Sequence, residues 1–336
     1  MKVYFTTVVR SAPVPKGGEL VKLDWEARRV EARAPIAPHD PEIDDPNPRG
    51  NARGGRGIAF AGDEVIAASY HSLEVFDRDL RPRRTITHPL FAGLHEVFLT
   101  PRGTLWAAST AIDAALEVDL STGRDVRQVW PREIPNFQDR LRLEPADVDK
   151  TADNRTRWLE KAHSEHRSHL HLNAVGEWNG ETLALLNGFG VIVNLDSEKI
   201  VLHDKRIRGG HNLLIGDDGT ATVNDSLGRT VRVYDLSERR PVRIHKLRAF
   251  PEVTRIVRRH DRAFRAKKAL RRLGIRLTPP RPLFVRGADR AGDLLFVGLS
   301  PASILAIDER RGTVAGLFRY SKDVRVCVHG LRVLPD

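Results

Sequence analysis

Cysteine is almost absent from this chain, and its absence excludes internal disulfide bonds. Cys327 is the only cysteine among 336 residues, so it has no partner within the chain. Disulfides belong mainly to oxidising compartments, and a chain without them fits a reducing one. We therefore expect a cytoplasmic protein.

Long hydrophobic runs are missing as well. The apolar stretches are only a few residues long, whereas a membrane-spanning helix needs about 20. Segment 1–13 has one lysine and a short apolar patch mixed with threonine, which predicts a β-strand rather than a signal peptide. No Gly-rich phosphate loop, Gly-x-Ser-x-Gly turn or cysteine pair is present, so the usual motifs of nucleotide, ester and thiolate-metal chemistry are lacking.

Negative charge is the scarcer sign. There are 44 Asp and Glu against 55 Lys and Arg, a formal charge of +11, which favours anionic ligands or surfaces. Segment 255–276 carries much of the excess. Phe264 is the only aromatic residue in the middle of this segment, so nucleic-acid binding by base stacking is not predicted. The alternative is a solvated basic face on a helix.

An alternating apolar run that ends in aspartate recurs six times. Alternation is typical of a strand that buries one face, and the aspartate can accept hydrogen bonds from amides of the following turn. In five of the six copies, two further β runs joined by a turn come first. Each unit therefore predicts four short antiparallel strands, the blade of a β-propeller. The aspartates are Asp24, Asp77, Asp119, Asp196, Asp235 and Asp308.

The first unit lacks its innermost strand, and the C-terminal segment predicts one additional strand that belongs to no other unit. We expect segment 328–334 to pair with segment 1–9 and close the ring. The predicted fold class is all-β: a single six-bladed β-propeller domain over 1–336, with a C-terminal strand closing the first blade and a short helical insertion. The blades are expected at 324–336 with 1–35, 52–90, 93–131, 169–207, 209–247 and 283–320.

Three insertions interrupt the repeat, and all fall between blades, which predicts that they share one face. Segment 36–51 is rich in Pro and Asp and predicts a loop. Segment 132–168 is polar, with a short helix expected around 155–163. Segment 251–276 predicts a basic helix that starts at a proline. Its partial apolar stripe consists of Val253, Ile256, Val257, Phe264, Leu270 and Leu273.

Alignment of the units places one residue of each at the start of the innermost strand. These strands surround the channel, so the six side chains are expected to converge at its mouth. The ends of the second strands reach the same face and add Tyr70, Asn187, Asn224 and Asp225. From the closing strand onward, the six are His329, Arg56, His95, His171, His211 and Arg286.

In the first of three interpretations, these histidines hold a metal. Neutral imidazoles of His95, His171, His211 and His329 would bind a transition metal, with Fe, Zn, Cu and Mn as candidates. An open position on the ion would allow catalysis. Carotenoid-cleaving oxygenases hold iron with four histidines in a propeller, although theirs has seven blades.

The surrounding residues have roles in this interpretation. Arg56 and Arg286 would bind the negative charge of a substrate, with Asn187 and Asn224 as further contacts. The proton carrier would be one of two residues, Asp225 or Tyr70.

In the second interpretation the ring binds an anion without a metal, through arginine and protonated histidine. The chain resembles bacterial arylsulfate sulfotransferases in architecture and residue type: these are six-bladed propellers with His and Arg at the channel, one His being the nucleophile. In the third, the histidines are structural. Gly210-His211 is similar to the Gly-His pair with which WD-repeat proteins tie a blade to its neighbour. His169, in a histidine-rich loop with His163 and His166, would join the site if that loop covers the mouth.

The blade pattern resembles the broad group of six-bladed propellers that includes SMP-30/gluconolactonase, strictosidine synthase and NHL-type proteins. The Glu and Asn/Asp metal pattern of gluconolactonase is not evident, so the resemblance does not imply lactonase activity. We expect a metal-dependent enzyme acting on a small, anionic organic substrate. The alternatives are a metal-free His/Arg transferase or lyase, and a binding or scaffold propeller whose segment 251–276 docks on a membrane surface or an acidic partner.

Overall fold

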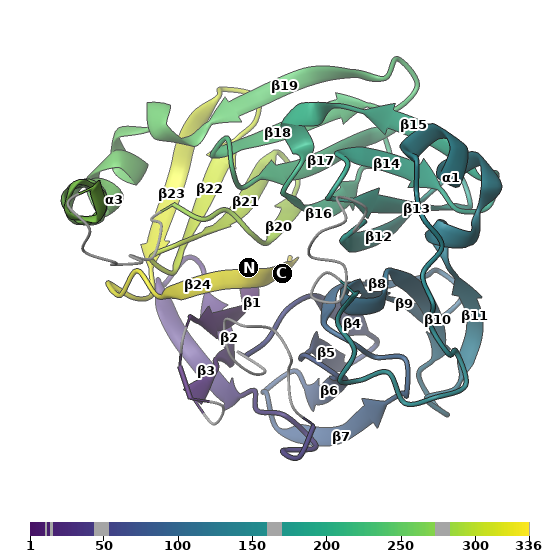
Figure 1. Cartoon of the computed structure of the whole chain (residues 1–336). Coiled ribbons are helices and arrows are strands. Elements are labelled where there is room, and N and C mark those ends of the chain that lie inside the picture. Colours follow the sequence, from purple (N-terminus) through teal and green to yellow (C-terminus); the bar gives the residue numbers. More distant parts are fainter. Residues whose placement is uncertain (11, 14–15, 44–53, 160–169, 273–282, 336) are drawn as a thin grey trace.

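Four-stranded sheets arranged around a common axis make up this protein (Figure 1). The structure is a computed structural model, and it describes residues 1–10, 12–13, 16–43, 54–159, 170–272 and 283–335. In this part of the chain, six sheets of four antiparallel strands form a six-bladed β-propeller. The predicted fold class is confirmed.

Each blade begins with its innermost strand and runs outward. The first blade combines the two ends of the chain, and the other five are continuous segments. Blade one is β24 (Val326–Leu334), β1 (Lys2–Val9), β2 (Glu19–Asp24) and β3 (Arg29–Pro35); blade two is β4 (Ile58–Ala61), β5 (Glu64–Ala68), β6 (Ser72–Asp77) and β7 (Pro82–Thr87); blade three is β8 (Leu94–Leu99), β9 (Thr104–Ser109), β10 (Ala114–Asp119) and β11 (Asp125–Val129).

The second half of the ring repeats this order. Blade four is β12 (Leu172–Trp178), β13 (Glu181–Leu186), β14 (Val191–Asn194) and β15 (Lys199–His203); blade five is β16 (Gly210–Ile215), β17 (Thr220–Asp225), β18 (Thr230–Asp235) and β19 (Arg240–Lys246); blade six is β20 (Ala288–Ala291), β21 (Leu294–Leu299), β22 (Ser303–Asp308) and β23 (Thr313–Arg319).

The C-terminal strand closes the ring as predicted. β24 pairs antiparallel with β1, with Lys2 opposite Leu334 and Phe5 opposite Leu331. Figure 1 shows β24 beside β1 at the inner edge of blade one. Val328 and Leu331 of β24 are buried with residues of blade six and of β1 and β2. Closure therefore joins both chain ends to the last blade through apolar contacts.

The recurrent aspartates perform the expected turn role in five of six blades. The side chain of Asp77, for example, accepts hydrogen bonds from the amides of Asp79 and Arg81, both at 2.9 Å. Blade four differs. There Asn194 accepts from the amides of Asp196 and Ser197 in the turn after the strand, while Asp196 accepts from the amide of Thr182 in the neighbouring strand β13. The equivalent of the other aspartates is therefore Asn194, because β14 ends two residues before Asp196.

The apolar core lies between the blades. One buried cluster joins blades two and three, and others join blades three with four, four with five, five with six, six with one and one with two. Each sheet thus has apolar side chains on both faces, as expected for a sheet between two neighbours.

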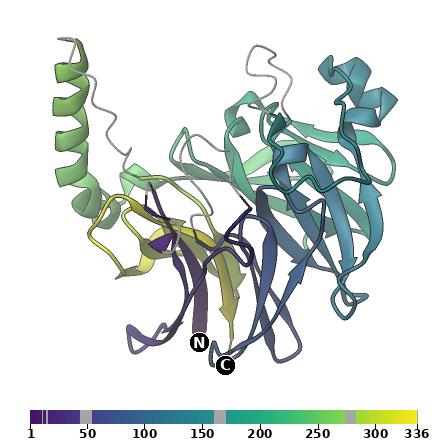
Figure 2. The ribbon, with the colours of Figure 1, turned by 60° about the horizontal axis from the view of Figure 1, so that its bottom comes forward.

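The helices lie between blades and on one side of the disc. In Figure 2, α1 (Pro135–Leu141) and α3 (Pro251–Arg272) rise on the side opposite the marked chain ends. The expected helix over 251–276 is confirmed up to Arg272, and the remainder lies outside the described residues. The described residues also contain short 3-10 turns at η2 (Thr110–Ile112), η3 (Pro131–Glu133), η4 (Lys205–Ile207) and η5 (Leu247–Ala249).

The helix expected around 155–163 is wrong in its described part. Arg155 to Trp158 are not helical, and helix is assigned only at Leu159, where the described stretch ends. Arg155 instead forms ion pairs with Asp153 and Asp40, which hold this stretch in turns. The insertion places its helix earlier, at α1, where a proline occupies the first turn. No helix in the described residues is long and apolar enough to cross a membrane.

Candidate functional site

The innermost strands bring six side chains to the channel mouth, all of them predicted from the repeat. His95 and His211 are the second residues of β8 and β16, and His329 is the fourth residue of β24. The other three precede their strands: Arg56 before β4, His171 before β12 and Arg286 before β20. Because every innermost strand starts on the insertion face, the blade repeat itself places these residues on that face.

The four imidazoles gather within one small volume. The ring centre of His95 lies 5.3 Å from that of His171, 5.6 Å from His329 and 6.1 Å from His211. His211 and His329 are 6.3 Å apart. His95, His211 and His329 are at most 4% exposed. The structure thus brings together the four histidines that we expected to form the site.

Both arginines contact imidazoles of this cluster. Nη1 of Arg56 lies 3.2 Å from each ring nitrogen of His95, and Nη1 of Arg286 bonds to Nε2 of His329. A guanidinium has donors only, so one ring nitrogen of each imidazole, Nε2, must accept from the arginine. The lone pairs of these two rings therefore point toward positive charge.

Hydrogen bonds at Nδ1 fix the tautomers. Nδ1 of His95 lies 3.0 Å from the carbonyl oxygen of Gly93, and Nδ1 of His211 lies 3.1 Å from Oδ1 of Asn173. Both partners are acceptors, so each Nδ1 carries the proton and each Nε2 keeps its lone pair. Arg56 accounts for the Nε2 lone pair of His95. No hydrogen bond from the described residues occupies Nε2 of His211.

Burial keeps these imidazoles neutral. Desolvation, followed by the positive charge of Arg56, lowers the pKa of His95 well below its ordinary value. Desolvation and then Arg286 do the same to the pKa of His211 and of His329. Near pH 7 the imidazoles of His95, His211 and His329 are therefore neutral, and the two arginines carry positive charge.

Glu96 lies one layer deeper in the channel, and sequence analysis missed it. Its Oε1 is 3.8 Å from Nδ1 of His329, and neither atom has a closer hydrogen-bond partner among the described residues. Burial raises the pKa of Glu96 to about 7, against the opposing charge of Arg332. The sequence feature that could have pointed to Glu96 as a site residue is its position directly after His95.

The two asparagines proposed as substrate contacts instead hold the next blade. Nδ2 of Asn187 donates to the carbonyl oxygen of Gly210 at 2.7 Å, next to His211. Nδ2 of Asn224 donates to the carbonyl oxygen of Gly287 at 3.2 Å, next to Arg286. Each side chain therefore positions the backbone beside a cluster residue.

Asp225 and Tyr70 have different surroundings. The carboxylate of Asp225 accepts from the amide of Gly228, the hydroxyl of Thr230 and Nε of Arg232, all in blade five. These contacts hold the turn that joins β17 to β18 and the strand beside it. Tyr70 is fully buried, its ring 6.0 Å from the guanidinium carbon of Arg56. Of the two expected proton carriers, Tyr70 is the one that adjoins the cluster.

A second missed residue, Asp113, positions His171. Asp113 is buried with a left-handed backbone, and its carboxylate accepts from the amides of Leu170 and His171 at 3.1 and 2.9 Å. Arg132 neutralises this carboxylate at 2.8 Å. An aspartate of the third blade therefore fixes the position of the backbone just before β12, the first strand of the fourth blade.

The histidine-rich loop cannot be placed, since His163, His166 and His169 lie outside the described residues. Among the residues that are described, no three or more His, Cys, Asp or Glu side chains form a group with the arrangement of a metal site.

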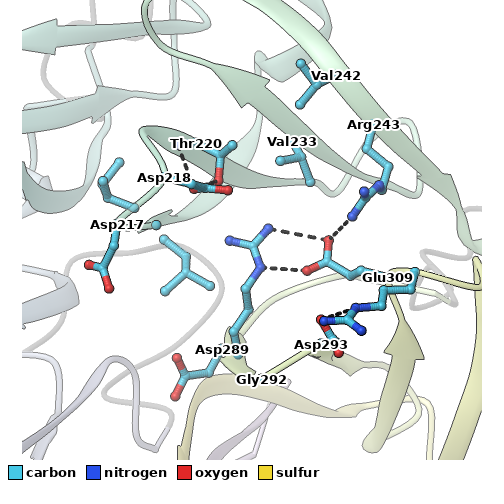
Figure 3. Close-up of a pocket in the computed structure, with 15 residues that line it drawn as sticks. Asp217, Asp218, Thr220, Val233, Val242, Arg243, Asp289, Gly292, Asp293 and Glu309 are labelled. Carbon is cyan, nitrogen blue, oxygen red and sulfur yellow. Dashed lines mark hydrogen bonds and ion pairs between the residues drawn. The ribbon is translucent and has the colours of Figure 1, made fainter.

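A further pocket lies away from the channel mouth. A cavity of about 700 Å³ opens between blades five and six (Figure 3). The turns that follow β16 and β20 line it, so it lies at the face opposite the channel mouth. Glu309 accepts there from Arg290 at 2.7 Å and from Arg243 at 3.1 Å. None of the six predicted mouth residues lines this cavity.

These features define a six-bladed β-propeller with a His/Arg cluster at its channel mouth. No family model matches the chain, and no curated protein matches its sequence. A solved structure of a protein of unknown function from Bacteroides caccae has a TM-score of 0.59 at 11% identity, covering 98% of this chain and 97% of that one. The β-propeller domain of Swd1 (Cps50) from Myceliophteria thermophila has a TM-score of 0.47 at 14% identity, covering 95% of this chain and 88% of that one. The Bacteroides similarity supports the fold alone.

Proposed function

We propose that the channel mouth binds the anionic group of a small organic molecule and that the protein acts on it without a metal. The observation that carries the proposal is the contact of Arg56 with His95 and of Arg286 with His329, two imidazoles that burial keeps neutral. A neutral imidazole leaves the positive charge of a guanidinium intact. A sulfate, phosphate or carboxylate can then accept from both guanidinium groups.

His211 is the group we assign to chemistry on the bound molecule. Its Nδ1 proton is directed to Asn173, so Nε2 is the basic nitrogen. A neutral imidazole held in this way can take a proton from the substrate, or attack a sulfuryl or phosphoryl group as a nucleophile. The reaction class is therefore a His/Arg-based transferase or lyase, and Tyr70 beside Arg56 is a candidate second proton carrier.

Anion binding is tested first, with sulfate and inorganic phosphate as probes. We expect both to raise the melting temperature above that in chloride of equal ionic strength, because a ligand of the folded state stabilises it. Arg286→Gln removes a charged donor, which costs roughly 1.5–3 kcal/mol, or about 10- to 100-fold in affinity. The control is Arg311→Gln, a guanidinium that is 82% exposed on blade six. Equal affinity in the two variants would contradict the proposal.

Activity is tested with aryl sulfates and aryl phosphates as probe substrates. We expect turnover that persists in chelator and is abolished by His211→Asn, with anion binding retained. Turnover that chelator abolishes and a metal salt restores would instead assign the site to metal chemistry.

A four-histidine metal site is the second candidate, and one observation favours it. His95 and His211 both direct Nδ1 to an oxygen acceptor, the arrangement that orients metal-ligating histidines. His171 and His329 would complete the ligands, and the ion would act as a Lewis acid. Elemental analysis of untagged protein from metal-supplemented medium separates the candidates: about one equivalent of Fe, Zn, Cu or Mn supports the metal site, and a small fraction of an equivalent supports the anion site.

A further inference from the structure

Helix α3 carries a line of arginines on its outward face. Arg255, Arg258, Arg259, Arg262 and Arg265, here called the arginine stripe, are all exposed. Their spacing of three and four residues places them on one side of the helix, about 5–6 Å from one to the next. The stripe is about 15 Å long at 1.5 Å per residue.

The opposite face of the helix fixes it to the propeller. Val253, Ile256 and Val257 are buried in the apolar cluster between blades five and six. These contacts occupy only the first turns of the helix. Figure 2 shows the rest of α3 projecting beyond the blades on the same side as α1. The stripe is therefore held on a rigid rod that a large partner can reach.

Within the described residues, no carboxylate forms an ion pair with the stripe. Asp261 is the nearest acidic residue in its middle, and Arg248 binds it with two hydrogen bonds of 2.7 Å each. Glu252 lies in the first turn, ahead of the stripe. The five guanidinium groups thus concentrate positive charge in a chain that already carries +11 overall.

We propose that the arginine stripe of α3 is a docking surface for the phosphate backbone of a nucleic-acid duplex. A guanidinium fits a phosphate with two parallel hydrogen bonds, and a duplex presents one negative charge per roughly 1.7 Å of its axis. A line of about five cations therefore meets a matching line of phosphates. This proposal does not depend on the chemistry at the channel mouth.

The neighbouring side chains favour a duplex over other anionic partners. Ala263, Ala266 and Ala269 are exposed beside the stripe, and they are too small to anchor a protein interface. A membrane-surface helix needs a continuous free apolar face, but in α3 Val253 and Val257 pack against the blades, and Leu270 is the large apolar side chain left exposed in the described part. Phe264, a single aromatic residue, offers little for base stacking, and phosphate contacts need no aromatic residue.

The test measures binding of a fluorescent 24-base-pair DNA duplex of arbitrary sequence by anisotropy, with an RNA duplex in parallel. We expect the protein to bind the duplex at low salt. The logarithm of the binding constant should fall linearly with the logarithm of the salt concentration, with a slope of about −4, because each neutralised phosphate contributes roughly −0.9. The stripe variant changes Arg258, Arg259, Arg262 and Arg265 to glutamine, which preserves helix propensity. We expect it to bind about 100-fold more weakly, with a slope near −1.

The matched control removes the same charge elsewhere. It changes four exposed arginines that form no ion pair in the described chain, namely Arg81, Arg124, Arg239 and Arg240. Circular dichroism and melting temperature establish that both variants fold. Equal loss of binding in the two variants would show a general charge effect and overturn the proposal. So would absence of duplex binding at low salt, or binding to phosphatidylserine vesicles in place of duplexes.

Discussion

Single side chains in the channel differ more in their surroundings than in their type. His95, His211 and His329 are all buried histidines, yet only His211 keeps an Nε2 that no described residue hydrogen-bonds. Glu96 is a carboxyl in the same channel, and its Oε1 lacks a partner there. Burial raises the pKa of this carboxyl despite the charge of Arg332 and a hydrogen bond from Asn212, because ionisation in a poorly solvated site is unfavourable.

Replacement of Glu96 by glutamine tests that protonation state. Its pKa rises from 4.5 to about 7 on folding, so between these values the unfolded chain releases a proton that the folded chain keeps. Wild-type stability should therefore fall as pH rises from 4.5 to 7, by about 3 kcal/mol, and level off above 7. The stability of Glu96→Gln should not fall between pH 4.5 and 7, because glutamine does not ionise. Urea unfolding at pH 5, 6, 7 and 8 measures it, with the exposed Glu238→Gln as control; parallel pH profiles of Glu96→Gln and wild type would refute the assignment.

At the scale of elements, neighbouring blades are joined by polar contacts as well as by their apolar faces. Glu309 of blade six binds Arg290 in its own blade and Arg243 in blade five (Figure 3). Desolvation alone would raise the pKa of Glu309, but hydrogen bonds from His245 and Arg290, together with the charges of Arg290 and Arg243, outweigh it and lower this pKa to about 2. The carboxylate therefore connects two sheets that have no backbone hydrogen bonds to each other.

Acid should weaken this junction in a defined window. A carboxyl with a depressed pKa contributes its full stabilisation above its ordinary value of 4.5, and the contribution disappears as pH falls toward 2. Glu309→Gln should therefore cost on the order of 2 kcal/mol at pH 7, and progressively less below pH 4.5. Chemical unfolding of variant and wild type from pH 7 to 3 gives this difference. A constant difference across the range would mean that the charge of Glu309 is not what stabilises the junction.

At the scale of the whole molecule, closure decides whether the ring exists. β24 supplies the innermost strand of blade one, and without it β1 would present an unpaired edge at the channel. Val328, Leu331 and Val333 of this strand are buried. Their burial contributes roughly 5 kcal/mol or more, against a typical total stability of about 5–15 kcal/mol.

Truncation after Lys322 should therefore destabilise all six blades, not blade one alone. We expect the melting temperature to fall by 10 °C or more, on the order of the shift that a loss of several kcal/mol gives. A synthetic peptide of residues 324–336 added in trans should restore part of the stability, whereas a scrambled peptide should not. If the truncated protein melts at the wild-type temperature, the closing strand does not contribute this stability to the propeller.

The sequence by itself determined the blades, the closing strand and the six residues at the inner strand starts. These follow from local rules, since alternation sets the strands and turn residues set their ends. Pro251 likewise marked the start of α3, because proline suits a first helical turn. Such signals lie within a few residues of one another, so they need no knowledge of the fold.

Only the tertiary structure decided which hydrogen bonds and ion pairs the residues of the candidate site form. Asp113 reaches the amide of His171 from 58 residues away, and Arg286 meets His329 from 43 residues away. Asn187 and Asn224 hold the next blade, and Glu96 faces His329 across the channel. Contacts between distant residues depend on how the blades are placed around the axis. The local sequence pattern therefore predicted which residues gather at the channel mouth. The packing of the blades decided which ring nitrogen of an imidazole keeps a lone pair that can bind a ligand or take a proton.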